Sequence, residues 1–238
     1  MWRGRVRRAI ASTDAVITVS EWSADDVSEV FGVDRDTIRV IKHGIDVETF
    51  STPTELSSEV AARISEDFVL YLGNIEPRKN LMPLVRAFQQ EPLRSAGLQL
   101  VIAGKPAWNF AESMAEIQAA PNVVHLGFVS DADRVALMQR TALFAFPSLY
   151  EGFGFPVLEA MAAGAPVATS RRGSLVEVAG PAWVLKDLTA PGAESLAACL
   201  ADEGWRAGVT DVGHAWARQF TWDVSIDEHV RVFESVLC

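Results

Sequence analysis

Short apolar runs rich in β-branched residues alternate along the chain with longer segments in which apolar residues recur at helical spacing. The apolar runs predict strands at residues 15–19, 38–41, 68–72, 98–103, 123–126, 143–146, 166–169 and 183–185. The longer segments predict helices at residues 23–31, 55–65, 80–92, 110–119, 131–140, 153–163 and 193–203. A strand followed by a helix, repeated in this way, indicates βαβ units and therefore a parallel sheet.

Two of the apolar runs do not alternate with polar residues at all. Residues 69–72 and 143–146 are apolar or aromatic at every position, which is typical of strands that helices cover on both faces. We therefore expect an α/β fold with a doubly wound parallel sheet. Ser130 and Asn80 are expected to cap the helices that follow them, because short polar side chains accept hydrogen bonds from free N–H groups at a helix start.

The two ends of the chain follow a different pattern. Residues 1–20 are expected to contain the end of a helix and then a lone strand without an obvious neighbour, although a strand needs one. Residues 216–237 are helical in pattern but are interrupted at residues 220–223, where Thr221 is expected to cap a second helix.

Composition and charge exclude several classes of protein. The chain has 238 residues, 49% of them hydrophobic, and can bury a large core. Its net charge of −10 repels polyanions, so broad nucleic-acid binding is not expected and an anionic ligand needs a local basic cluster. Cys199 and Cys238 are too few for a disulfide framework or a zinc site, which favours the cytoplasm. No apolar run approaches the ~20 residues that cross a bilayer.

The first eight residues contain four arginines and no apolar segment follows them, so a secretion signal is not expected. Two interpretations remain open. The arginines form a solvated helix face, which we favour, or they touch an anionic membrane surface, which limits membrane association to peripheral contact at the inner face.

Glycines follow four consecutive predicted strands. Gly73, Gly104 and Gly127 come directly after three of them, and Gly152 and Gly154 follow the fourth. Ligands of doubly wound sheets bind beyond the carboxyl ends of the strands, and glycine lets the backbone approach a ligand closely. We therefore expect these four strand ends to form one ligand-binding rim.

Two cations follow the predicted strand 68–72. Arg78 offers a planar fork and Lys79 a point charge, and together these geometries suit a diphosphate. The alternative is a solvated helix start, where the helix dipole disfavours cations.

Glu151 and Glu159 bracket a Gly-Phe-Gly-Phe-Pro turn that leads into a predicted helix. With Glu159 about two turns inside that helix, the carboxylates are expected up to ~12 Å apart. This separation is too large for a glycosidase-type pair and suits two contacts on one elongated ligand, the alternative being two ordinary surface glutamates. Between them, the backbone N–H groups of residues 152–155 are expected to form a seat for an anion.

Four segments of the chain together resemble a known family. Residues 14–20 (DAVITVS), 43–46 (HGID), 73–80 (GNIEPRKN) and 151–160 (EGFGFPVLEA) are similar to motifs of the family 4 (group 1) glycosyltransferases, especially the mannosyltransferase-like members. This family has the GT-B fold, in which two Rossmann-like domains face each other across a cleft and the C-terminal one binds a nucleotide sugar.

The resemblance implies a division of the chain into three parts. They are a remnant of the N-terminal acceptor-side domain with its final helix, strand and linker (1–45), a donor-binding domain (46–220) and a C-terminal crossover helix (221–238). His43 then lies between the domains, where it either touches the cleft or is a plain loop residue.

The resemblance also assigns roles to the residues above. Arg78 and Lys79 hold the donor diphosphate, Glu159 takes the ribose hydroxyls, and Glu151 contacts the transferred sugar. Glu151, Arg78 and Lys79 are thus the expected catalytic set. Near the base the resemblance places Gly104, Lys105, Phe128 and Val129. Beside the sugar and phosphates it places the backbone of Gly152, Phe153 and Gly154. Gly73 and Phe155 complete the expected donor site.

The implied reaction moves a sugar from a nucleoside diphosphate to an acceptor hydroxyl with retention, in glycan or polysaccharide biosynthesis. Mannose is the sugar that the resemblance favours, GDP- and UDP-linked donors both stay open, and the acceptor is a glycan or a lipid-linked sugar. Neither a cofactor nor a metal is expected, because Asp131 and Asp133 are interpreted as helix-cap residues and not as metal ligands. The alternative is a non-catalytic half or subunit that binds a nucleotide sugar and needs a separately encoded N-terminal domain.

Overall fold

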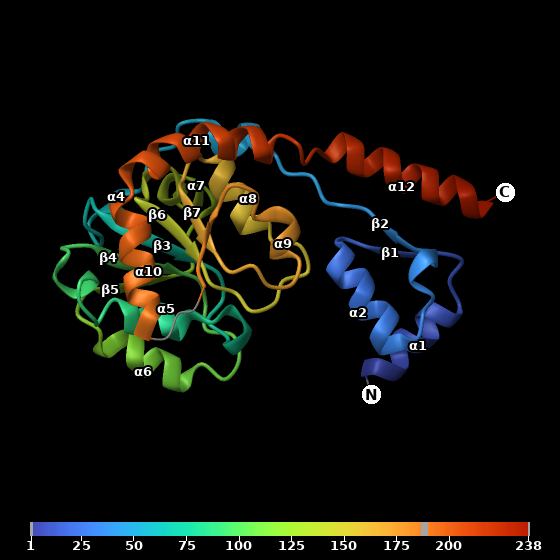
Figure 1. Cartoon of the computed structure of the whole chain (residues 1–238), viewed down its shortest axis with the longest axis horizontal. Coiled ribbons are helices and arrows are strands. Elements are labelled where there is room, and N and C mark those ends of the chain that lie inside the picture. The colour runs from blue at the N-terminus through green and yellow to red at the C-terminus, as the bar shows by residue number, and fades with distance from the viewer. Residues whose placement is uncertain (1, 187–189, 238) are drawn as a thin grey trace.

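The computed structural model describes residues 2–186 and 190–237, in which the chain forms two parallel sheets (Figure 1). The larger sheet has the strand order β5-β4-β3-β6-β7-β8. Its strands are β3 (Phe68–Leu72), β4 (Gln99–Ala103), β5 (Val123–Gly127), β6 (Leu143–Phe146), β7 (Val167–Thr169) and β8 (Trp183–Val184). Each lies at, or within two residues of, the predicted position.

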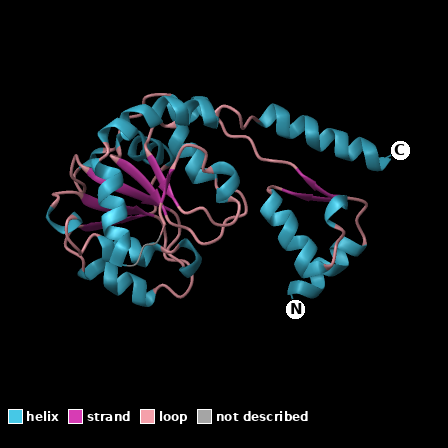
Figure 2. Ribbon diagram, viewed as in Figure 1, coloured by secondary structure: helices cyan, strands magenta, loops and turns pink. Residues whose placement is uncertain are grey.

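Helices cover both faces of the larger sheet (Figure 2). One face packs against α3 (Val47–Ser51), α7 (Asp131–Arg140), α8 (Phe155–Ala162) and α11 (Glu203–Ala217). The other face packs against α5 (Leu81–Ala87), α6 (Ala111–Ala119) and α10 (Ala190–Ala201). The strand order reverses direction between β3 and β6. These features confirm the doubly wound α/β fold.

The helix caps follow the sequence only in part. The hydroxyl of Ser130 accepts a hydrogen bond from the backbone N–H of Asp133 at 3.0 Å, which confirms the predicted cap. The prediction for Asn80 is wrong. Its backbone is left-handed (φ +53°), and its side-chain amide donates to the carbonyl oxygen of Pro147 at 3.3 Å, so that it joins two loops at the sheet edge.

Some helices differ from the predicted ones. The predicted helix 55–65 shrinks to α4 (Ser58–Ala61), and α3, α9 (Leu175–Val178) and most of α11 are not predicted at all. α3 and α9 are too short to show a clear apolar period.

The N-terminal part has its own two-stranded sheet. It contains α1 (Trp2–Ala11), β1 (Val16–Thr18), α2 (Glu21–Phe31) and β2 (Ile38–Val40). β1 pairs in parallel with β2, and Val16 lies opposite Ile38. The expectation of a lone strand is therefore wrong, because the chain supplies the neighbour about twenty residues later, after a crossover helix.

The N-terminal part is connected to the larger sheet by two segments of chain, one around Gly44 and Ile45 and the other around residues 220–222. The backbone N–H of Ile45 donates to the carbonyl oxygen of Phe220 at 3.0 Å. A Cβ on Gly44 would lie 2.1 Å from the backbone nitrogen of Trp222, so only glycine fits where the two segments cross. The crossing leads directly into α12 (Trp222–Leu237), which runs back toward the N-terminal part (Figure 1).

α12 begins where the sequence predicts a second helix. The hydroxyl of Thr221 accepts a hydrogen bond from the N–H of Val224 at 3.3 Å, which confirms the predicted cap. None of the helices in the part of the chain that the structure describes is both long and apolar enough to cross a membrane. Cys199 is buried, and Cys238 lies outside the described residues.

Candidate functional site

A cavity of about 410 Å³ lies beyond the carboxyl ends of β3, β4 and β5. Five of the expected site residues line it together, namely Gly73, Gly104, Lys105, Phe128 and Val129. They come from three separate strand ends, and the strand order of the sheet makes those ends neighbours. The parallel arrangement alone therefore gathers these residues at one edge.

Two glycines let the strand ends approach each other at the floor of this cavity. Gly104 has a φ of +155°, and a Cβ there would lie 2.0 Å from the carbonyl oxygen of Gly73. That contact is with backbone, which cannot move aside as a flexible side chain can. The close approach brings the turn after β3 against the turn after β4, where Ile75 also forms a bridge with Pro106.

The rim of the cavity combines an aromatic ring and a cation. Phe128 is 74% exposed, and the Nζ of Lys105 lies 4.5 Å from the centroid of its ring. An exposed aromatic face next to a cation offers a stacking surface for a planar ligand.

An ionic cluster built around the buried Lys79–Glu151 pair lies at the ends of β3 and β6. The Nζ of Lys79 is 2.6 Å from Oε1 of Glu151, and both residues are only 8% exposed. The Nη1 of Arg78 contacts Oε2 of the same carboxylate at 3.2 Å. The hydroxyl of Ser148 donates to Oε1 of Glu151 at 2.6 Å. The structure thus brings the three expected catalytic residues together.

In this arrangement Arg78 and Lys79 are already paired with carboxylates. The Nε of Arg78 also contacts Oε1 of Glu76 at 2.7 Å, so two cations face two carboxylates. The roles expected for the cations and for Glu151 stay predictions, and a diphosphate at this position has to compete with Glu151 for both cations.

Glu159 lies on α8, four residues after the first residue of that helix. It is therefore one turn inside, about 6 Å along the axis, and the expectation of two turns is wrong because α8 begins at Phe155. Both carboxylate oxygens of Glu159 contact Nη1 of Arg134, at 3.1 and 3.0 Å. Burial raises the pKa of Glu159 above its ordinary value, and the charge of Arg134 opposes this.

Arg134 is a site residue that the sequence reasoning missed. It lines the cavity beside Val129, so its ion pair connects Glu159 to the same site. The available signal was its position in the first turn of the helix that follows Phe128 and Val129.

In the turn of residues 152–155, the backbone N–H groups and the aromatic side chains have different surroundings. Among the described residues, none accepts a hydrogen bond from the backbone N–H groups of Gly152, Phe153, Gly154 or Phe155. The rings of Phe153 and Phe155, however, lie 5.2 and 5.0 Å from the ring of His43. The side chains of Phe153 and Phe155 are therefore occupied by packing against His43, and the anion seat expected from the backbone N–H groups stays a prediction.

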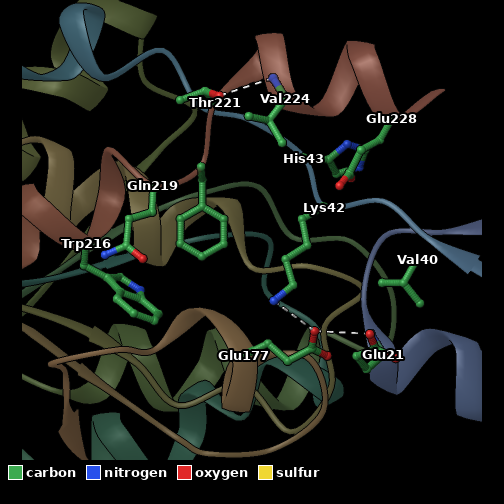
Figure 3. A pocket seen from close by; sticks show the side chains of 11 residues that line it. Glu21, Val40, Lys42, His43, Glu177, Trp216, Gln219, Thr221, Val224 and Glu228 are labelled. Atoms are coloured by element: carbon green, nitrogen blue, oxygen red, sulfur yellow. Dashed lines mark hydrogen bonds and ion pairs between the residues drawn. The ribbon is translucent and has the colours of Figure 1, made fainter. Parts of the chain in front are cut away.

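His43 lines a second cavity, of about 350 Å³, between the two parts of the chain (Figure 3). Lys42, Glu177 and Trp216 also line it. Burial, and to a smaller extent the charge of His229, lower the pKa of His43 below its ordinary value.

The Asp-x-Asp segment serves the start of α7. One carboxylate oxygen of Asp133 accepts from the N–H of Ser57 at 2.8 Å and the other from the hydroxyl of Ser130 at 2.7 Å. Within residues 2–186 and 190–237, no group of three or more His, Cys, Asp or Glu side chains is placed to hold a metal ion. The expectation that no metal is required stays a prediction.

Comparison with known proteins extends over almost the whole chain. O-antigen chain mannosyltransferase B of Escherichia coli is 29% identical over 96% of this chain and 62% of that protein. MMP alpha-(1->4)-mannosyltransferase of Mycolicibacterium hassiacum is 32% identical over 76% of this chain and 43% of that protein. The chain thus spans less than two thirds of the length of these curated relatives.

Solved structures share the fold. Anabaena Alr3699/HepE in complex with UDP-glucose superposes with a TM-score of 0.79 at 20% identity, covering 94% of this chain and 64% of that one. Sucrose-phosphate synthase of Thermosynechococcus elongatus gives a TM-score of 0.79 at 20% identity, covering 99% and 61%. The Rossmann-like α/β architecture is thereby confirmed.

Two family models match the chain in succession. The model for Glycosyltransferase Family 4 matches residues 1–49. The model for Glycosyl transferases group 1 matches residues 54–198, which is more than half of the chain. As the resemblance of its motifs predicts, the chain belongs to the group 1 glycosyltransferases.

Proposed function

We propose that the chain carries the donor site of a retaining glycosyltransferase that moves a sugar, mannose in the first instance, from a nucleoside diphosphate to an acceptor hydroxyl in glycan biosynthesis. One observation carries the proposal. The glycine-lined cavity and the Arg78–Lys79–Glu151 cluster lie at the carboxyl ends of adjoining strands. Mannosyltransferases among the relatives support the sugar, and a neighbouring structure that holds UDP-glucose supports the class of donor.

The geometry suits a nucleotide sugar along its whole length. The base stacks near Phe128, and the ribose lies near Glu159 and Arg134. The diphosphate lies between the two cations and the free N–H groups of the 152–155 turn. Breaking the bond to the sugar builds negative charge on the diphosphate, and preorganised cations and N–H groups aimed there lower the barrier. As the diphosphate takes over Arg78 and Lys79, Glu151 is released to accept hydrogen bonds from the sugar hydroxyls.

Calorimetric titration of the purified chain with GDP, UDP and ADP tests the proposal. We expect one nucleotide to bind with a micromolar to millimolar Kd. Arg78→Ala and Glu159→Ala should each weaken that binding at least tenfold, or about 1.4 kcal/mol. Glu29→Ala, on an exposed position of α2, serves as the control and should leave the Kd unchanged. Negligible binding of all three nucleotides would refute the donor site.

An assay for release of the sugar from the matching nucleotide sugar distinguishes an enzyme from a non-catalytic binding half. Slow, donor-dependent turnover that Lys79→Ala abolishes supports an enzyme. Binding without any turnover, in the presence of mannosyl-lipid and glycan acceptors, supports the non-catalytic half that needs another domain.

A further inference from the structure

The loop that carries Glu151, residues 148–153, is in contact with the N-terminal part of the chain. The carbonyl oxygen of Gly152 accepts from the hydroxyl of Ser20 at 2.8 Å and from that of Ser23 at 3.3 Å. Both serines belong to the start of α2, where Ser20 is the cap residue. The residue next to Glu151 is therefore held from the N-terminal side, across more than 120 residues of sequence.

Glu177 binds the same turn of α2 and so links it to the part of the chain that contains the larger sheet. Its carboxylate accepts from the backbone N–H groups of Glu21 and Trp22, at 3.2 and 3.1 Å. These are first-turn donors that have no acceptor inside their own helix, and a carboxylate there is favoured by the helix dipole. The Nζ of Lys42 lies 3.6 Å from the same carboxylate (Figure 3).

The short helix α9, which carries Glu177, also contacts the loop directly. The hydroxyl of Ser174 lies 2.8 Å from the carbonyl oxygen of Glu151 and 2.9 Å from that of Phe153. The loop is thus enclosed between Ser174 on one side and the serines of α2 on the other. Glu177 connects these two sides, because it lies on α9 next to Ser174 and accepts hydrogen bonds from the first turn of α2.

On the basis of the function proposed above, we propose that Glu177 is a positioning residue for the donor site. It fixes the first turn of α2 against the Glu151 loop, and in this way it sets where the Glu151 carboxylate lies relative to the transferred sugar. Glu177 lines neither the donor cavity beyond β3, β4 and β5 nor the Arg78–Lys79–Glu151 cluster, so it acts on the donor site through the elements that it holds in place.

A second contact determines how large the effect should be. The hydroxyl of Tyr150 donates to Oδ2 of Asp26, on the next turn of α2, at 2.6 Å. This contact is exposed and stays in place when Glu177 is replaced. Removing Glu177 should therefore loosen the loop without detaching α2.

Amide hydrogen exchange of the ligand-free full chain, followed by NMR, is the first test. In Glu177→Ala, the amides of Glu21 and Trp22 should exchange at least tenfold faster. The amide of Leu149, which lies in the loop and donates to the carbonyl oxygen of Arg78 at 2.8 Å, should exchange at least threefold faster. Glu177→Gln keeps an acceptor oxygen and should give intermediate rates, whereas Glu29→Ala should change none. Faster exchange at Glu21 and Trp22 with an unchanged Leu149 would overturn the proposal.

Titration with a nucleotide and its sugar conjugate is the second test, using UDP against UDP-glucose and GDP against GDP-mannose. Glu177→Ala should weaken the sugar conjugate at least fivefold and change the bare nucleotide less than twofold, with Glu177→Gln in between. Equal weakening of both ligands, or of neither, would contradict a positioning role. If the wild-type chain binds no nucleotide, the donor site itself fails, while the exchange experiment still decides whether Glu177 holds the loop.

Discussion

The two sheets of this molecule are built from the same strand-helix-strand unit but are covered very differently. In the larger sheet, Val69, Leu70, Leu100 and Phe144 are fully buried, because helices lie on both faces. In the smaller sheet, Val16 and Ile17 are only half-buried. The strand-helix-strand unit alone therefore does not make a core. A second layer of helices does, and in this chain the larger sheet has it, while the helix α2 beside the smaller sheet contacts the Glu151 loop.

The largest difference is expected when one large apolar side chain is truncated to alanine in each sheet in turn. Phe144→Ala should lower the free energy of unfolding by about 3–5 kcal/mol, because it leaves a cavity in a fully packed site. Ile17→Ala in the smaller sheet should lower it by only about 1 kcal/mol, because only part of that side chain leaves water on folding. Urea denaturation followed by circular dichroism measures both. Equal losses would mean that the smaller sheet is as integral to the fold as the larger one.

Charge removal at the buried cluster should have the next largest effect. Lys79→Met leaves the buried Glu151 carboxylate with Arg78 as its remaining cation, and we expect a loss of about 3 kcal/mol. The double variant Lys79→Met with Glu151→Gln removes both charges and should recover most of that loss. Thermal unfolding at matched pH measures it, and a double variant as unstable as Lys79→Met alone would show that packing and not charge dominates here.

Adding a methyl group to a glycine should have opposite effects on stability at the cavity floor and at an exposed helix position, and only the first should affect nucleotide binding. Gly104→Ala pushes against the backbone of Gly73 and should cost about 1–3 kcal/mol, with loss of nucleotide binding in calorimetry. Gly208→Ala on α11, where a Cβ meets nothing within 4 Å, should instead stabilise by about 0.5–1 kcal/mol. Unchanged nucleotide binding in Gly104→Ala would show that the nucleotide does not bind in this cavity.

The smallest expected effect is a loss of stability on acidification, caused by His43 at the junction of the N-terminal part and the larger sheet. The pKa of His43 is lowered by burial, so below about pH 6.5 the unfolded chain takes up a proton more readily than the folded one. The wild-type chain should therefore lose stability on acidification relative to His43→Asn, and the gap between their melting temperatures should shrink from pH 8 to pH 5. A widening gap would mean that Glu228, which lies beside His43 (Figure 3), stabilises the protonated ring.

Much of this molecule follows from local patterns in the sequence. Apolar runs locate the strands of the larger sheet, and parallel pairing then brings together the residues that follow them, such as Gly73, Gly104 and Phe128. Arg134 was missed because its role depends on an ion pair with Glu159 on another helix. Glu177 was missed for the same reason, since its partners are more than 150 residues away in the chain. Contacts between distant segments leave no periodic signal.

The pairing of Glu151 with both neighbouring cations also sets a threshold for occupancy. An anion with a single charge exchanges one carboxylate for an equivalent group and gains little, so chloride, acetate or a simple monoester has no advantage over the resident side chain. A ligand with two linked phosphates brings more charge and more acceptor atoms than it displaces. If the proposed diphosphate binds at this cluster, Glu151 acts as a built-in competitor that favours it over singly charged anions.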